Sequence, residues 1–324
     1  MKFLIRSVFI SMWLVILFTV CLACTDDKRE RDISQIRVDF KLFRFDLEFA
    51  RTEPEDLNRL KLEYPYFFPE KVPDSVWLAK LNDSLQIELE KEVARVFPDN
   101  DELEEELRRV FQHIKYYFPE AKLPIKVVTT TSEVDYRHKV IWTDSLLVLS
   151  LDTFLGSENK LYEGVYDYIK IGMTKERIAP ALAMEFASQI IPSINRPTLI
   201  ESMVHEGQKL YVAQQLSPGC SEALLLEYTD REYDWTEANA RFVWEYFIMN
   251  DLLFSTEPQL YNRFVAQAPF SKFYLDMDRE SPGGVGKYLG LQIVNSFMDR
   301  SETDLKGLLT TRPEVIFNRA KYKP

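Results

Sequence analysis

The stretch from Ile125 to Leu151 reads IKVVTTTSEVDYRHKVIWTDSLLVLSL and decides the fold class of this chain. It contains three short runs rich in Val, Ile, Leu and Thr, which are separated by polar turns and lie at 125–131, 140–142 and 146–151. Residues of these types favour strands, and the runs are too short for typical helices. The stretch therefore predicts a small three-stranded sheet in the middle of the chain.

On both sides of this stretch, apolar residues recur at every third or fourth position, which is the period of an amphipathic helix. One such stripe runs from Leu78 to Phe97, and a second begins in the acidic run Asp99–Glu106 and continues to Ile114. Four more helices are predicted at 174–190, after Pro197, at 237–254 and at 285–298. The order of helices, sheet and helices predicts an α+β fold that is mostly helical.

The first 23 residues have the layout of an export signal. Lys2 and Arg6 precede an uncharged apolar run from Val8 to Ala23, which is short for the roughly 30 Å core of a bilayer. Cys24 follows directly, and a strongly charged segment begins two residues later. An apolar run that ends in a small residue and a cysteine is typical of a lipoprotein signal. The Cys24 thiol is therefore expected to carry lipid, and we expect palmitate among its acyl chains.

One position departs from this pattern, because Cys21 stands where leucine is usual. The alternative is therefore a transmembrane anchor with two incidental cysteines. The lipoprotein interpretation gives a signal peptide at 1–23, a lipidated tether at 24–36 and a single globular domain at 37–324. It predicts that lipid on Cys24 holds the protein to the inner or outer membrane of the cell envelope, with the domain in the periplasm.

The charge balance is acidic. The chain has a formal net charge of −11, and removing Lys2 and Arg6 with the signal peptide would change it to −13. This balance argues against nucleic acid as a partner and against a basic face that docks on a membrane. If Cys24 is acylated, Cys220 is the only thiol left, so no internal disulfide is expected.

The sequence contains few candidates for catalysis. The three histidines lie far apart, and no pair has the i, i+4 spacing that grips zinc on one helical face. A Gly-x-Ser-x-Gly elbow and a phosphate-binding loop are both missing from the sequence. His205-Glu206 begins like a zinc-protease motif, but Lys209 stands where its second histidine would be. We therefore expect no metal, no cofactor and no catalytic residue.

Five segments are spread in order over nearly the whole chain after the lipoprotein signal: Tyr64–Pro69, Phe111–Pro119, Ala268–Tyr274, Ser281–Gly290 and Phe317–Pro324. Together they resemble a known family, the gliding motility-associated lipoprotein GldB of Bacteroidetes. The resemblance implies a cell-envelope lipoprotein that serves gliding motility and the associated type IX secretion machinery. It further implies a non-enzymatic accessory or scaffold subunit that binds other envelope proteins.

The helical segments after the sheet also resemble the layout of gluzincin-like zinc proteases. In that layout Met184 and Ser188 occupy the places of the two histidine ligands, Glu185 that of the general base and Glu206 that of the third ligand, while Tyr288 lies on a following helix. A thioether and a hydroxyl are poor zinc ligands. The resemblance therefore implies a degenerate zincin-like fold, a pseudoenzyme with a vestigial cleft formed by these five residues.

Two alternatives stay open at this point. One is an active metallopeptidase-like hydrolase with an atypical site. The other is a module that uses the former protease cleft to bind peptides or cell-wall fragments.

Overall fold

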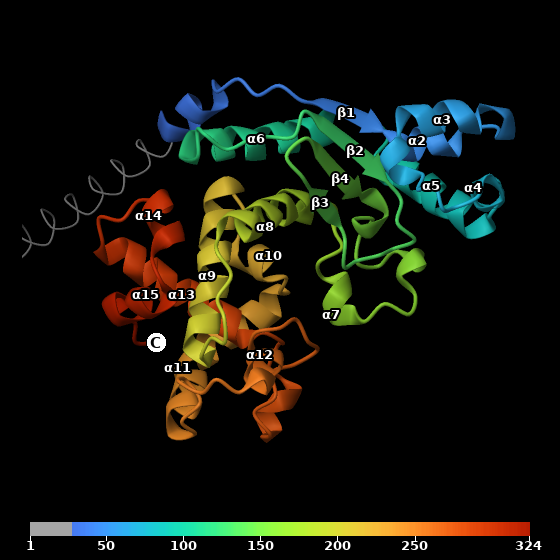
Figure 1. Ribbon diagram of the computed structural model, residues 1–324. Helices are drawn as coiled ribbons and strands as arrows, with labels where there is room; N and C mark the ends of the chain where they lie inside the picture. The colour runs from blue at the N-terminus through green and yellow to red at the C-terminus, as the bar shows by residue number, and fades with distance from the viewer. Residues whose placement is uncertain (1–27) are drawn as a thin grey trace, which may run out of the picture.

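The central sheet has four strands in a computed structural model that describes residues 28–324 (Figure 1). Their order is β1-β2-β4-β3; β2 is parallel to β1 and β4, whereas β3 is antiparallel to β4. The three strands expected from the sequence are present, and the mostly helical α+β class is confirmed. The strand bounds are Lys41–Arg44 (β1), Lys126–Thr130 (β2), Val140–Trp142 (β3) and Leu146–Ser150 (β4).

Strand β1 was not expected, so the prediction of a three-stranded sheet was one strand short. It pairs in parallel with β2, and Lys41 is the partner of Lys126. Its four residues carry a charge at each end and only Leu42 and Phe43 between them. Such a short run has no recognisable period of two, which is why the sequence pattern missed it.

The rest of the described chain is mainly helical (Figure 1). Residues 28–34 form an N-terminal helix, and further helices precede and follow the sheet. Their bounds are Phe45–Ala50 (α2), Leu57–Glu63 (α3), Asp74–Leu81 (α4), Ser84–Val96 (α5), Asp101–Tyr117 (α6), Asp167–Lys170 (α7), Ile178–Ile190 (α8), Leu199–Leu216 (α9), Glu222–Leu226 (α10), Asp230–Met249 (α11), Pro258–Phe264 (α12), Val285–Arg300 (α13), Leu305–Thr310 (α14) and Pro313–Ala320 (α15).

The helix predicted from Leu78 to Phe97 is in fact two helices, α4 and α5. Asp83 separates them, because its side chain accepts a hydrogen bond from the backbone N–H of Gln86 and so caps the start of α5. The apolar stripe continues across this break, so the helical spacing of apolar residues cannot show where one helix ends and the next begins.

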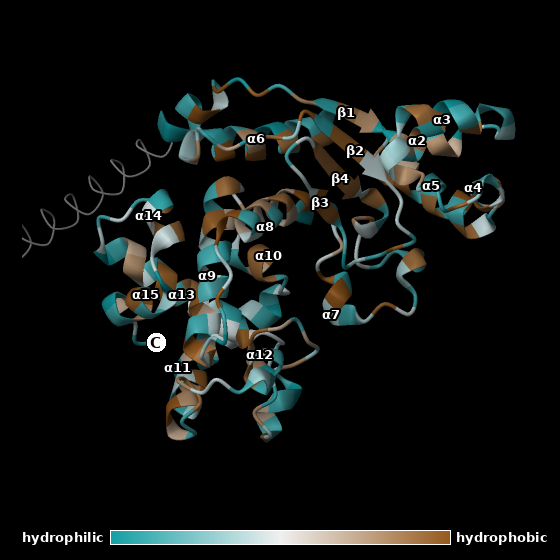
Figure 2. Ribbon diagram, in the orientation of Figure 1, coloured by the Kyte–Doolittle hydropathy of each residue, from teal (hydrophilic) through white to brown (hydrophobic). Residues whose placement is uncertain are grey.

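The sheet separates two apolar cores. Val127, Leu147 and Leu149 point into a large core shared with α6, α8, α9, α11 and α13, whereas Val128 points into a smaller one beneath α2, α3 and α4. Alternate strand residues face opposite sides of a sheet, so these strands are buried on both faces. Accordingly, β4 and α8 are coloured as hydrophobic along most of their length (Figure 2).

Helix α9 lies at the centre of the helical part and crosses α13 at backbone contact distance. A Cβ placed on Gly290 would lie 1.8 Å from the carbonyl oxygen of Met203, and one on Gly207 would lie 2.2 Å from the carbonyl oxygen of Gly290. No larger residue fits at either position without moving a helix. This crossing fixes α9, which carries Glu206, against α13, which carries Tyr288.

The segment expected to be a tether is folded from residue 28 onward. Ile33 is fully buried, and the Gln112 side chain of α6 donates hydrogen bonds to the backbone oxygens of Ser34 and Ile36, at 2.9 and 3.0 Å. Cys24 and the signal region lie outside the described residues. Among residues 28–324, no helix combines the length and the apolar character that crossing a bilayer would take.

Candidate functional site

Glu206 lies buried on α9 beside a lysine and a histidine. Its Oε1 atom lies 2.8 Å from the Lys209 ammonium and 3.8 Å from Nδ1 of His205. Burial alone would raise the pKa of Glu206, but the hydrogen bond from His205 and the charge of Lys209 outweigh it and hold the pKa at about 2. Burial and this carboxylate together raise the pKa of Tyr261, which hydrogen-bonds to Glu206, to about 12.

Met184, Glu185 and Ser188 share helix α8. Met184 is half-buried and packs against the large core, whereas Ser188 is exposed. Glu185 accepts a hydrogen bond of 3.0 Å from Gln189, whose amide also donates to the backbone oxygen of Trp142 at the edge of the sheet. The local partners of Glu185 are therefore on α8 and not on α9.

Tyr288 is buried on α13 among other partners. Its ring lies 5.8 Å from that of Tyr233, and burial followed by the charges of Glu237 and Glu222 raises its pKa to about 12. Within residues 28–324, no hydrogen bond or ion pair joins Glu206 to Glu185 or to Tyr288, and no group of three His, Cys, Asp or Glu side chains could hold a metal ion. The vestigial cleft stays a prediction.

A pocket of about 830 Å³ opens elsewhere, where the segment after β4 faces the turn between α10 and α11. We call it the Arg177 pocket. Sequence reasoning did not single out this place, since no motif marks it and its walls come from three separate segments. It is lined by Ser157, Glu158, Tyr166, Asp167, Tyr168, Lys170, Ile171, Thr174, Arg177, Leu224, Tyr228, Thr229, Asp230, Glu232 and Pro269.

Arg177 builds the wall of this pocket. Its side chain is only 5% exposed, and its guanidinium donates hydrogen bonds to the backbone oxygens of Leu224 and Tyr228 at the end of α10. A buried arginine that binds carbonyl oxygens at a helix end also neutralises the negative end of the helix dipole. Arg177 thereby ties the start of α8 to α10.

Glu227 directly precedes Tyr228, which lines the Arg177 pocket. Glu227 lies in the left-handed conformation with φ of 57°, 3.3 Å from the Lys139 ammonium, and accepts a hydrogen bond of 2.9 Å from Gln267. Lys139 also donates to the backbone oxygen of Gly172 at 2.8 Å. A Cβ on Gly172 would lie 2.3 Å from the Glu227 carboxylate, so only glycine leaves room for this ion pair.

Two tyrosines lie at the mouth of the Arg177 pocket. Tyr166 is 68% exposed and stacks on Tyr168, with ring centroids 5.8 Å apart and planes at 18°. Exposed aromatic rings of this kind are enriched where proteins bind partners. The charged lining is mixed, with two cations and four carboxylates. The pocket thus offers aromatic faces together with polar groups of both signs.

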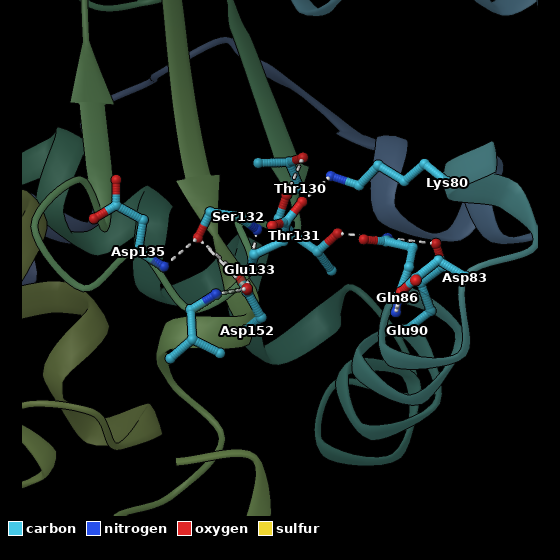
Figure 3. A network of polar contacts seen from close by, with 11 residues as sticks. Lys80, Asp83, Gln86, Glu90, Thr130, Thr131, Ser132, Glu133, Asp135 and Asp152 are labelled. Carbon is cyan, nitrogen blue, oxygen red and sulfur yellow. Dashed lines mark hydrogen bonds and ion pairs between the residues drawn. The ribbon is translucent and has the colours of Figure 1, made fainter. Parts of the chain in front are cut away.

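A second polar cluster lies where the parallel strands end (Figure 3). Asp152, fully buried just after β4, accepts hydrogen bonds from the backbone N–H groups of Ser132 and Val134, at 2.9 and 2.7 Å. Glu133 and Val134 both have positive φ, which side chains rarely adopt. Asp152 therefore acts as a clamp that holds a strained loop in place.

The comparisons with known proteins agree with the resemblance drawn from the sequence. The family model of gliding motility protein GldB matches residues 26–324. No curated protein and no solved structure matches the chain. The match covers almost the whole chain beyond the signal region and points to a lipoprotein of the cell envelope. The chain therefore belongs to the family of gliding motility protein GldB.

Proposed function

We propose that this protein is a non-enzymatic scaffold subunit of the gliding machinery and of the type IX secretion apparatus associated with it. Lipid on Cys24 would hold it to a membrane, and its periplasmic domain would bind other envelope proteins. The observation that carries the proposal is the family match, which extends over residues 26–324.

The chemistry around Glu206 supports a role without catalysis. A general base or metal ligand needs a carboxylate whose lone pairs are free, whereas Oε1 of Glu206 is already bound by Lys209 at 2.8 Å. Met184 and Ser188, which hold the places of histidines in the resemblance, offer a thioether and a hydroxyl.

The partner would bind at the Arg177 pocket. Its volume of about 830 Å³ suits a few side chains of an extended polypeptide, and the Tyr166–Tyr168 pair supplies aromatic contact area at its mouth. The aromatic segments at 64–68 and 116–118 suit this role less. Tyr66 and Tyr116 are exposed there, but Tyr64, Phe68 and Phe118 are buried in the cores.

The single variant Tyr166→Ala tests the proposal in cells that lack the native gene. Because Tyr166 is exposed, we expect normal protein levels, loss of cross-linking to envelope partners and loss of gliding. Tyr274→Ala is the matched control, since this side chain is 74% exposed on another part of the surface.

Unimpaired gliding and secretion after deletion of the whole gene would refute the scaffold role. Zinc analysis tests the hydrolase alternative. Stoichiometric zinc in protein purified without chelator, lost on Glu206→Gln, would replace the scaffold with a metallopeptidase.

A further inference from the structure

The C-terminal segment is basic in an otherwise acidic protein. Residues 300–324 contain six Lys or Arg against three Asp or Glu, although the whole chain has a net charge of −11. An uneven distribution of this kind gives one region a positive potential of its own. The net charge of the chain therefore does not describe the surface that this segment forms.

Three of these cations line one pocket. It has a volume of about 650 Å³ and lies between the end of α13 and α15. Arg300, Arg319 and Lys321 are exposed there, Glu302 is the single acidic residue in the lining, and none of the three cations forms an ion pair with a residue in the described part of the chain. We call this place the basic pocket.

The basic pocket lies at the same end of the molecule as the start of the described chain. Helix α9 connects the two regions. Its Gln215 accepts a hydrogen bond of 3.3 Å from Tyr117 of α6, the helix that holds the N-terminal helix. Its Gln208 donates to the backbone oxygens of Leu308 and Thr311, just before α15. Accordingly, the N-terminal helix and α14 lie on the same side of the ribbon, opposite α3 and α4 (Figure 1).

The N-terminal helix cannot swing away as a tether would. Its buried Ile33 and the hydrogen bonds from Gln112 hold it against α6, and Glu30 lies 3.2 Å from the imidazole of the buried His113. Lys28 lies four positions after Cys24, and even a fully extended chain of that length spans only about 14 Å. Lipid on Cys24 would therefore bring this end of the protein against the bilayer.

We propose that the basic pocket rests on the anionic phospholipid headgroups of the membrane that holds the lipid anchor. The inference rests on the lipidation of Cys24, which belongs to the proposed function. Acyl anchors gain from a second, basic contact, and an anionic bilayer repels the acidic remainder of the domain. The basic pocket thus fixes the orientation of the domain on the membrane.

Full-length lipidated protein in vesicles can test this orientation. A fluorophore on Asn318→Cys, in a Cys220→Ser background, reports contact with nitroxide-labelled headgroups, and Asn58→Cys on α3 is the control position. On vesicles with about one-third phosphatidylglycerol, we expect quenching at position 318 and none at position 58. On neutral phosphatidylcholine, quenching at position 318 should fall, although the lipid still holds the protein.

The charge dependence is tested by reversing three cations together. Each basic residue near an anionic surface strengthens contact about fivefold, so Arg300→Glu, Arg319→Glu and Lys321→Glu should weaken the contact on the order of 100-fold. The control reverses three exposed cations at the opposite end, Arg51, Lys71 and Lys91, and should leave quenching unchanged.

Two outcomes would overturn the inference and are distinguishable. If the protein floats with anionic vesicles but position 318 is not quenched, or is quenched equally in the triple variant, the basic pocket does not face the membrane. If the protein floats with neither kind of vesicle, the lipid anchor of the proposed function fails together with this inference.

Discussion

Glu206 and Asp152 are both buried carboxylates, and their pKa values are shifted in opposite directions. Burial would raise the pKa of Glu206, but its contact with His205 and the charges of Lys209 and Lys287 hold it at about 2. Burial raises the pKa of Asp152, and the hydrogen bonds that it accepts from Val134 and Ser132 offset the effect only in part. The partners of a carboxylate therefore decide its charge, even where burial is similar.

This difference separates two roles. Glu206 is a charged member of a network of side chains on α9, whereas Asp152 organises a loop through backbone N–H groups. Replacing Glu206 would cost its contacts with Lys209, His205 and Tyr261. Asp152 supports the left-handed residues Glu133 and Val134, which depend on it.

The largest effect is expected at Asp152. Replacement by Ala leaves two half-buried backbone N–H groups and the Ser132 hydroxyl without this acceptor, so the free energy of unfolding should fall by about 4 kcal/mol. Asn keeps one oxygen in place for both N–H groups, and Asp152→Asn should cost about 1 kcal/mol. Urea denaturation of both variants measures the difference, and equal losses would show that Asp152 does not clamp the loop.

A smaller effect is expected for Glu206→Gln. The folded-state pKa lies below the ordinary value of 4.5, so the carboxylate contributes stability above pH 4.5 that is lost as the pH falls toward 2. The variant should therefore lose about 2 kcal/mol at pH 7 and progressively less below pH 4.5. Denaturation curves across this range measure it, and a loss independent of pH would contradict the ion pair.

Asp152 should show the opposite dependence on pH. Its folded-state pKa is raised, so the folded protein binds this proton more readily than the unfolded chain does. Wild-type stability should therefore rise relative to Asp152→Asn as the pH falls toward the ordinary pKa of 3.8. The same denaturation series checks this sign, and a parallel decline with Glu206→Gln would remove the contrast between the two carboxylates.

A much smaller effect is expected at Glu185. Its one hydrogen bond is to Gln189 on the same helix, and such i, i+4 contacts contribute only about 0.3 kcal/mol. Glu185→Ala should therefore leave the unfolding midpoint and gliding unchanged. Lost gliding at unchanged stability would instead place Glu185 in a functional site.

No gain of zinc binding is expected from restoring the histidines of the protease layout. In Met184→His with Ser188→His, Glu206 should remain bound to Lys209, and calorimetry should detect no zinc affinity that depends on Glu206. Tight one-to-one binding that disappears on adding Glu206→Gln would show that the three positions converge after all.

Much of the fold follows from local pattern. The runs at 125–131, 140–142 and 146–151 became strands, and the stripe that ends at Ile114 became α6. Local pattern placed the start of α11 too late, because the helix begins at Asp230 after a capping box formed by Thr229 and Glu232. The N-terminal helix escaped detection because Ile33 is its one fully buried residue and charges surround it.

The functional surfaces were harder to predict. The Arg177 pocket combines residues near 157–177 with others near 224–232, and the basic pocket combines residues 297–303 with 318–321. Our expectation that the protein has no basic face for docking on a membrane rested on the net charge of the chain. Net charge is an average over the whole sequence and does not report where cations gather. Only the folded chain brings these distant segments together, so neither surface appears in a short motif.

The parallel pairing of β1 with β2 also has a consequence for the kinetics of folding. Lys41 and its partner Lys126 are separated by 85 positions, so the sheet closes a long loop through a non-local contact. During synthesis and export, the N-terminal end emerges first and has no strand to pair with until the middle of the chain follows. Completion of the sheet is therefore a late step, and β1, an edge strand of the finished sheet, stays unpaired until then.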